Sequence, residues 1–281
     1  MLDGMTDRPL TRLPVALVQL DAGEDVTANL RVATALADEA AAGGARLVAL
    51  PEYLQYRGPD AGYQASAHPV PGPHTALFAE IARRRGAWIL VGSLAEEAAD
   101  GRCHNTSVLL DPAGRIAATY RKIHLFDIEV EAGPSDRESS RVAPGSEAVT
   151  VEVDGLTIGL TVCYDLRFPE LYRTLALRGA TVLTVPSSFT ERTGRDHWEV
   201  LLRARAIENG AWVLAPAQFG GAGGLRAYGR SMVVDPWGTV VAQAPDGVGI
   251  VRAEIDLERA AAVRRQIPSL ANRVPAAYDL G

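Results

Sequence analysis

The segment Leu156–Glu170, LTIGLTVCYDLRFPE, places one thiol at the point where a strand turns into a helix. The run before Cys163 is apolar and rich in β-forming residues, and Pro169 stands where a proline can open a helix. This arrangement is similar to a nucleophile elbow. A thiol at a helix N-terminus is also expected to shift toward thiolate, because the helix dipole and the free N–H groups favour the anion. The alternative is that Cys163 is a small buried apolar residue, as most free cysteines are.

The chain of 281 residues is long enough for one large α/β domain or two small ones. Its hydrophobic fraction of 47% and charged fraction of 22% are ordinary for a soluble globular protein. The net charge of −6 and the lack of a long basic run argue against a nucleic-acid or anionic-membrane partner. Because no linker or composition break divides the chain, we expect residues 1–12 to be a disordered tail and residues 13–281 to form a single domain.

The cellular compartment is predicted from the cysteines and the N-terminus. The two cysteines, Cys103 and Cys163, argue against a disulfide framework and fit a reducing cytosol. The segment Met1–Arg12 is charged and lacks the apolar stretch of a secretory signal. No apolar run approaches the length of a membrane span. We therefore expect a cytoplasmic protein.

Strand and helix patterns alternate along the chain, which favours sheet with helices packed on it. Strands are predicted over residues 13–20, 46–50, 87–92, 180–185, 211–217 and 249–255. Helices are predicted over 28–42, 75–85, 168–178, 196–209 and 257–266. Turn residues predict three hairpins, at 107–120, 149–162 and 230–242, so the sheet is expected to be mixed and not simply parallel.

Two further segments carry residues that fit a thiol nucleophile. Glu52 directly follows a buried strand in the segment LPEY, and Lys122 stands at a strand end in YRKIHLFD. Each of them alone would usually be an ordinary surface residue. With Cys163 they make one chemical set. The thiolate can attack a carbonyl or nitrile carbon, the carboxylate can move the proton, and the ammonium can stabilise the oxyanion.

These three segments together resemble the nitrilase superfamily of carbon–nitrogen hydrolases. Glu52, Lys122 and Cys163 occur in the chain order of that superfamily, 70 and 41 residues apart, and their flanking residues match as well. The resemblance implies an α/β fold of the four-layer α-β-β-α sandwich type. It implies Glu52 as general base, Lys122 as oxyanion stabiliser, Cys163 as nucleophile and the N–H of Tyr164 as second oxyanion donor. It also implies a homodimer or higher homo-oligomer, with contacts from residues 164–178 and the C-terminal segment.

Many members of this superfamily carry a second active-site glutamate between the lysine and the cysteine. Glu138, in RESSR, matches its place in the ω-amidase-like branch, 16 residues after Lys122. The following Ala-Pro-Gly, residues 143–145, also matches. Glu129 and Glu131 are the competing candidates.

The branch is narrowed by three segments. True nitrilases tend to have Trp-Glu-Asn after the cysteine, whereas this chain has Tyr-Asp-Leu at 164–166. The segments 186–208 and 228–238 resemble deaminated-glutathione amidases and ω-amidases, and the latter segment resembles the first group more. The implied substrate is the amide of a small carboxylate-bearing 2-oxo acid, such as deaminated glutathione. The alternatives are an ω-amidase, a carbamoyl or aliphatic amide hydrolase, and a catalytically silent binding protein on the same scaffold.

The remaining candidates concern substrate contacts and cofactors. An arginine can orient a substrate carboxylate. The candidate substrate-binding residues are Tyr53, Arg167, Phe189, Arg195 and His197. The five histidines show no metal-binding spacing, so we expect no metal and no cofactor. The expected partners are a small-molecule amide and water.

Overall fold

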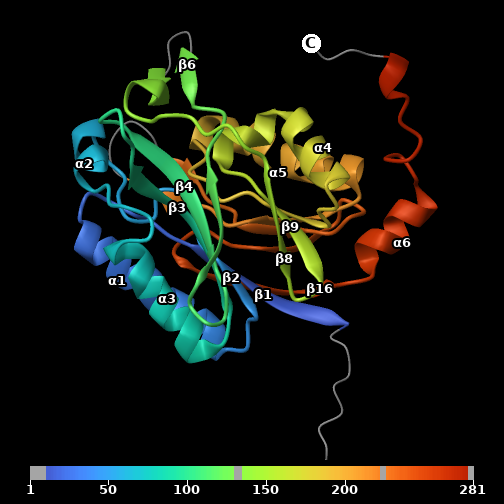
Figure 1. The fold of residues 1–281 in the computed structure, drawn as a ribbon, viewed down its shortest axis with the longest axis horizontal. Coiled ribbons are helices and arrows are strands. Elements are labelled where there is room, and N and C mark those ends of the chain that lie inside the picture. The colour runs from blue at the N-terminus through green and yellow to red at the C-terminus, as the bar shows by residue number, and fades with distance from the viewer. Residues whose placement is uncertain (1–10, 130–134, 222–225, 278–281) are drawn as a thin grey trace, which may run out of the picture.

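The computed structural model describes residues 11–129, 135–221 and 226–277. Within them, two six-stranded sheets lie face to face (Figure 1). The first has the order β16-β1-β2-β3-β4-β5, formed by β1 Arg12–Gln19, β2 Leu47–Ala49, β3 Trp88–Glu97, β4 Cys103–Leu110, β5 Ile116–Arg121 and β16 Gly249–Asp256. The second has the order β15-β14-β11-β10-β9-β8, formed by β8 Val149–Val153, β9 Leu156–Leu160, β10 Val182–Thr184, β11 Trp212–Ala215, β14 Met232–Val234 and β15 Val240–Gln243.

Helices cover the outer faces of both sheets. The first sheet carries α1 Val26–Ala42 and α3 Pro73–Arg85, and the second carries α4 Pro169–Leu177 and α5 Glu191–Asn209 (Figure 1). The predicted α-β-β-α sandwich with mixed sheets is therefore present. The smaller elements are α2 Asp60–Ala65, α6 Arg259–Gln266, the pairs β6 Asp127–Glu129 with β7 Ser135–Arg137 and β12 Phe219–Gly220 with β13 Ala227–Tyr228, and the 3-10 turns Glu138–Ser140, Cys163–Arg167 and Pro275–Ala277.

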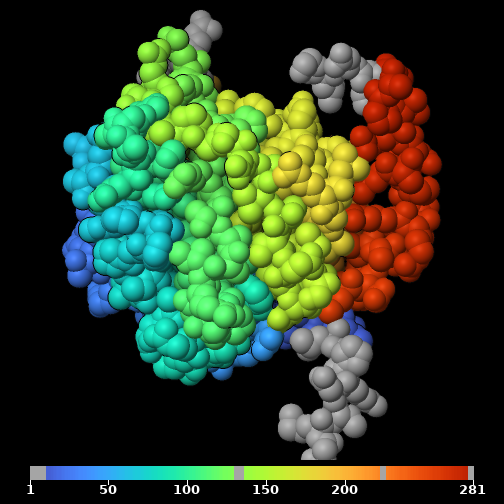
Figure 2. Space-filling view, viewed as in Figure 1, coloured from blue at the N-terminus to red at the C-terminus, as the bar shows by residue number. Residues whose placement is uncertain are grey.

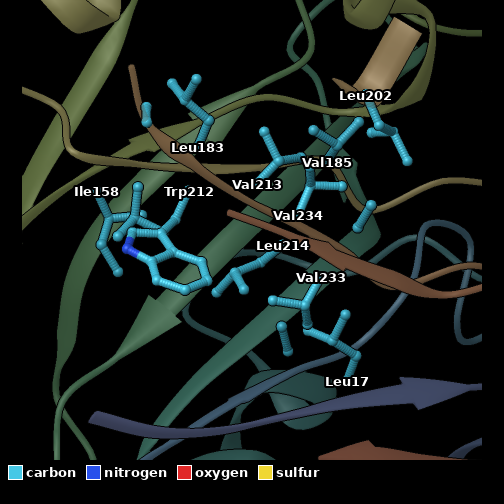
Figure 3. Packing of buried hydrophobic residues seen from close by; sticks show 14 of the residues in the cluster. Leu17, Ile158, Leu183, Val185, Leu202, Trp212, Val213, Leu214, Val233 and Val234 are labelled. Atoms are coloured by element: carbon cyan, nitrogen blue, oxygen red, sulfur yellow. The ribbon is translucent and has the colours of Figure 1, made fainter. Parts of the chain in front are cut away.

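Alternate side chains of β1 point to opposite faces of the first sheet, and this explains why the strand contributes to two cores. Leu13, Val15 and Leu17 point between the sheets and join the larger core, whereas Ala16 and Val18 join the core beneath α1 and α3. Figure 3 shows the larger core, with Leu17 of the first sheet near Val233 of the second. Burying one such leucine or valine contributes about 1.5–3 kcal/mol to stability.

The parallel strands deliver loops to one edge of each sheet. In the first sheet β1, β2 and β3 are parallel, and in the second β9, β10 and β11 are parallel. The loops that follow β2, β9 and β10 carry Glu52, Cys163 and Ser188. Ligand sites of α/β proteins lie at the carboxyl ends of such strands. The sandwich thus brings loops from both sheets to one place.

Several element boundaries differ from the sequence prediction. Arg12 was expected in the tail but begins β1, because it pairs with Asp256 of β16. Residues 1–10 lie outside the described residues. Helix α5 begins at Glu191 and not at residue 196, and it includes a glycine, Gly194. A Cβ at Gly194 would lie 2.4 Å from the Cβ of Tyr228, so the residue that weakens the helix pattern serves packing. None of the described helices is both long enough and apolar enough to span a bilayer.

Candidate active site

Cys163 lies at the tip of a strained turn. Its φ of 48° is in the left-handed region, which residues other than glycine rarely adopt. A 3-10 turn over Cys163–Arg167 follows, and α4 begins with Pro169 at its first position. The backbone N–H of Cys163 donates to the carbonyl of Pro186, at 2.9 Å. The structure therefore has the elbow that the sequence predicts.

Asp165 fastens this elbow to the strand end that carries Lys122. It is fully buried and accepts hydrogen bonds from the hydroxyl of Tyr120 at 2.7 Å and from the backbone N–H of His124 at 3.1 Å. Its Oδ1 also lies 2.7 Å from Nδ1 of His124. Because Tyr120 and His124 flank Lys122, these contacts fix the lysine relative to Cys163.

Glu52 is held by a tight turn after β2. The next residue, Tyr53, has a φ of 56°, and its backbone N–H donates to Oγ of Ser93 at 3.1 Å. Gly92 lets the turn approach β3, since a Cβ there would lie 1.8 Å from the carbonyl oxygen of Leu50. The position of the Glu52 carboxylate is thus set by the left-handed backbone at Tyr53 and by the absence of a side chain at Gly92.

Two carboxylates and one ammonium meet beside the thiol. Nζ of Lys122 lies 3.0 Å from Oε1 of Glu52 and 2.8 Å from Oε2 of Glu138. All three side chains are at most 1% exposed. The other oxygen of Glu52 accepts the backbone N–H of Ser188 at 2.8 Å. Such a buried ionic cluster persists only because each charge is paired and hydrogen-bonded.

The structure distinguishes two of the three candidates for the second glutamate. Glu138 contacts Lys122, and the hydroxyl of Tyr53 donates to its Oε1 at 2.6 Å. Glu129 lies on β6 and is exposed. Glu131 lies outside the described residues. Glu138 is therefore the described carboxylate that shares the lysine with Glu52.

The charges in this cluster stabilise one another. Burial alone would raise the pKa of Glu138, but the charge and hydrogen bond of Lys122, with hydrogen bonds from Tyr53 and the N–H of Phe126, hold that pKa below its usual value. Burial alone would lower the pKa of Lys122, but the charges of Glu138 and Glu52 raise it well above the usual value. Lys122 is therefore a fixed cation at neutral pH.

The expected thiolate is not supported. Burial raises the pKa of the Cys163 thiol well above its usual value, and the charge of Glu52 and a hydrogen bond to it act in the same direction. The charge of Lys122 acts the other way but does not prevail. The helix dipole contributes little here, because α4 begins six residues beyond Cys163 and the intervening turn is 3-10. A protonated thiol beside a carboxylate can pass its proton to that carboxylate as the sulfur attacks an electrophile.

A cavity of about 410 Å³ opens onto this cluster. Among the predicted site residues, those that line it are Glu52, Tyr53, Lys122, Cys163, Tyr164, Arg167 and Phe189. The guanidinium of Arg167 lies 5.1 Å from the ring centroid of Phe189. Glu138 lies behind the lining and contacts the cavity residues Tyr53 and Lys122.

Two candidate substrate contacts are not brought into the cavity. Arg195 is exposed and pairs with Glu191 one turn earlier on α5, at 2.7 Å. His197 does not line the cavity, but its Nδ1 lies 3.3 Å from a guanidinium nitrogen of Arg167. Both side chains are exposed on α5, and the predicted helix start at residue 196 left Arg195 outside the helix, so the sequence indicated no direction for it.

Sequence reasoning missed one residue at the centre of the cluster. Asn105, in the interior of β4, donates to both Glu52 and Glu138. Asn105 begins a run of three small polar residues, Asn105–Ser107, that are all buried, and such a run leading into the apolar end of a strand is the signal that could have drawn attention to it. Among the described residues, no group of three or more His, Cys, Asp or Glu side chains could hold a metal ion.

The geometry is matched by comparison with known proteins. Residues 14–265 match the family described as carbon-nitrogen hydrolase. This chain belongs to that family. A Synechocystis protein named deaminated glutathione amidase is 41% identical over 266 residues, which cover 92% of this chain and 97% of that protein. The human protein named omega-amidase NIT2 is 38% identical over 261 residues, which cover 92% and 94% of the two chains.

Solved structures agree with the sequence relatives. The C. elegans NitFhit protein superposes with a TM-score of 0.91 and is 36% identical, covering 97% of this chain and 68% of that chain. The yeast protein Nit3, described as a member of the nitrilase superfamily, has a TM-score of 0.83 at 30% identity and covers 92% and 95%. This carbon–nitrogen hydrolase is thus an amide-hydrolysing enzyme with the nitrilase fold, as the sequence resemblance predicted.

Proposed function

We propose that this hydrolase cleaves amides through a thioester on Cys163, with Glu52 as general base and acid and Lys122 as oxyanion stabiliser. The observation that carries the proposal is the contact of Lys122 with Glu52 and Glu138, beside a cavity that Glu52, Lys122 and Cys163 line. Glu138 holds Lys122 in place and balances its charge.

The first half of the reaction acylates the enzyme. Sγ of Cys163 attacks the amide carbonyl carbon while the thiol proton passes to Glu52. The carbonyl oxygen becomes an oxyanion, which Lys122 and the backbone N–H of Tyr164 stabilise. The C–N bond then breaks, Glu52 returns the proton to the departing nitrogen, and the amine leaves behind a thioester.

The second half hydrolyses the thioester. Water enters where the amine stood, Glu52 takes one of its protons, and the resulting hydroxide adds to the thioester carbon. When the C–S bond breaks, the sulfur regains the proton from Glu52 and the carboxylic acid leaves. The raised pKa of the Cys163 thiol supports this proton path, since the resting sulfur holds the proton that Glu52 moves.

The hydrogen-bond count at Lys122 supports its role. An ammonium has three N–H donors. Among the described residues, Glu52 and Glu138 accept two of them. The third is available to an oxygen in the cavity, which Lys122 lines. Because the two carboxylates fix the ammonium, it requires little reorganisation as the oxyanion forms.

The proposed substrate is the amide of a 2-oxo acid, with deaminated glutathione as the best one. Relatives about 40% identical carry that name, and the 38% identical ω-amidase supports the same acyl group with ammonia as the leaving group. A cavity of about 410 Å³ is in the range that holds ligands of this size. Arg167, which lines it, offers a guanidinium to a substrate carboxylate.

We expect deaminated glutathione to have the highest kcat/KM in a panel with α-ketoglutaramate, simple aliphatic amides, N-carbamoyl amino acids and a nitrile. The margin over substrates that lack the 2-oxo acid is expected to be roughly 10–100-fold, because leaving a polar group of the site unpaired costs about 1–3 kcal/mol. Release of α-ketoglutarate and ammonia measures the rates. If α-ketoglutaramate has the higher kcat/KM, the enzyme is an ω-amidase. Turnover of only carbamoyl or aliphatic amides contradicts the branch assignment and leaves the mechanism standing.

Two arginine variants test the carboxylate contact within that panel. Arg167→Gln is expected to lose the preference for 2-oxo acid amides. Arg195→Gln is the matched control, because Arg195 is exposed, pairs with Glu191 and lies outside the cavity lining. Equal effects of the two variants would contradict a role for Arg167.

We further propose a cytoplasmic homodimer formed through α4 and the C-terminal segment. Leu177 at the end of α4 and Val274 in the C-terminal segment are 51% and 59% exposed, so each offers an apolar side chain that a second subunit could cover. Figure 2 shows the C-terminal segment along one side of the molecule, beside the part of the chain that holds α4 and α5.

Light scattering is expected to give about twice the chain mass of 29.9 kDa. Leu177→Glu is expected to shift the protein toward the monomer, since burying an unpaired carboxylate at an interface is unfavourable. Leu77→Glu on α3 is the matched control, because Leu77 is 44% exposed on the helix layer of the other sheet. A monomeric wild type contradicts the proposal.

A further inference from the structure

Asn105 contacts both glutamates of the site from the interior of a strand. Its side chain is fully buried, and Nδ2 lies 2.9 Å from Oε1 of Glu52 and 3.2 Å from Oε1 of Glu138. Its backbone carbonyl accepts the N–H of Lys122 at 2.9 Å. Asn105 and Lys122 are therefore neighbours across the two strands, and each touches both carboxylates.

The burial of this amide has no explanation in packing alone. Burying an amide is unfavourable unless its polar atoms are satisfied. Both acceptors of its N–H groups are carboxylates, whereas its Oδ1 has no hydrogen-bond partner among the described residues. The contacts that Asn105 does make are thus those to Glu52 and Glu138.

We propose that Asn105 is a positioning residue that keeps Glu52 and Glu138 ionised and fixes their separation, a role that rests on the proposed function of Glu52 as base. Lys122 supplies one positive charge to two carboxylates. A cationic side chain in place of Asn105 would offset the negative charge that makes Glu52 a base. The neutral amide of Asn105 donates two hydrogen bonds and adds no charge. Asn105 does not line the cavity, so it acts through the glutamates and not on the substrate.

The groups that face the two carboxylates do not themselves titrate in the acid range. They are Lys122, Cys163, Tyr53, Tyr63 on α2, and Arg57. The pKa values of the lysine, the thiol and the two phenols lie above their usual values, and an arginine stays charged at these pH values. The difference in the acid limb of kcat/KM between the wild type and an Asn105 variant therefore reports the carboxylate pair that Asn105 contacts.

The test is the pH dependence of kcat/KM for Asn105→Leu, measured with the best amide of the panel. Loss of the hydrogen bonds destabilises the ionised carboxylates, so protons bind at higher pH. We expect the acid limb to move up by about one to two pH units, the size of one hydrogen bond to a charged group. We expect kcat to fall about 10–100-fold with little change in KM.

Two further variants separate this role from a structural one. Asn105→Asp keeps the shape and adds a third carboxylate, so it is expected to move the acid limb at least as far and decides the matter if the leucine variant does not fold. Asn209→Leu is the matched control. Asn209 is also fully buried with an unpartnered Oδ1 among the described residues, but its Nδ2 donates to a backbone carbonyl of α5. It is expected to melt at lower temperature with an unmoved acid limb.

An acid limb that stays at the wild-type pH in a folded Asn105→Leu or Asn105→Asp enzyme would overturn the inference. So would an equal displacement in Asn209→Leu. The proposed function is tested separately by the loss of turnover in Cys163→Ala. If Cys163→Ala is inactive and the acid limb of the Asn105 variants does not move, only the role of Asn105 is excluded.

Discussion

Cys163→Ala is expected to lower kcat for amide hydrolysis on the order of 10⁶-fold while the protein stays folded. Covalent hydrolases lose about this much when the nucleophile is removed, because the residual site can only bind and polarise the substrate. The side chain of Cys163 is small and borders the cavity, so the alanine variant loses little packing. Single-turnover kinetics and a thermal melt measure the two quantities on the same sample.

Two matched variants make this result specific. Cys103→Ala removes the other buried cysteine, which lies in a separate apolar cluster with Tyr56 and Val142, and it is expected to keep wild-type turnover. Cys163→Ser keeps the shape but is expected to be nearly as inactive as alanine, because a hydroxyl is much less acidic than a thiol. Near-wild-type turnover in Cys163→Ala would exclude the thioester mechanism.

The sequence allowed the central residues to be predicted because each stands at a strand end. Glu52, Lys122 and Cys163 follow β2, β5 and β9, and hydrophobic patterns locate buried strands well. Three residues of one chemistry at three strand ends are informative together, although each alone is ordinary. The α-β-β-α arrangement came from the resemblance, since alternation of elements alone predicts only helices packed on sheet.

Other features depend on tertiary contacts that a single sequence does not display. Asn105 lies inside a strand, and its importance follows from the approach of Glu52 and Glu138, which are 53 positions before and 33 positions after it. The expected thiolate at Cys163 is not supported because the helix dipole can be inferred from sequence, whereas burial beside Glu52, which raises the pKa of the thiol, cannot. Arg195 and Arg167 are equally plausible carboxylate ligands until the direction of each side chain is known.

Glu52→Gln is expected to lower kcat by about 10²–10⁴-fold, the usual contribution of a positioned general base. Glutamine has nearly the same shape, and its carbonyl oxygen can still accept a hydrogen bond from Lys122 or Ser188, so the cluster is expected to persist. What the variant cannot do is take the proton that the raised pKa of Cys163 keeps on the sulfur. Steady-state kinetics across pH, with KM and kcat separated, measures this loss.

The pH profile of the Glu52→Gln enzyme identifies the group that moves the proton. If Glu52 is the base, the residual rate is expected to lose its acid limb and to rise with pH as hydroxide or the thiolate takes over. Glu129→Gln is the control, because Glu129 is an exposed glutamate on β6 and its variant is expected to match the wild type. If the Glu52→Gln enzyme has a kcat within about tenfold of wild type and keeps the acid limb, the proton transfer is assigned to Glu138. The oxygens of Glu138 accept hydrogen bonds from the same lysine and asparagine, Lys122 and Asn105. In that case Glu138→Gln has to show the larger loss, and the roles of the two carboxylates exchange within an unchanged thioester mechanism.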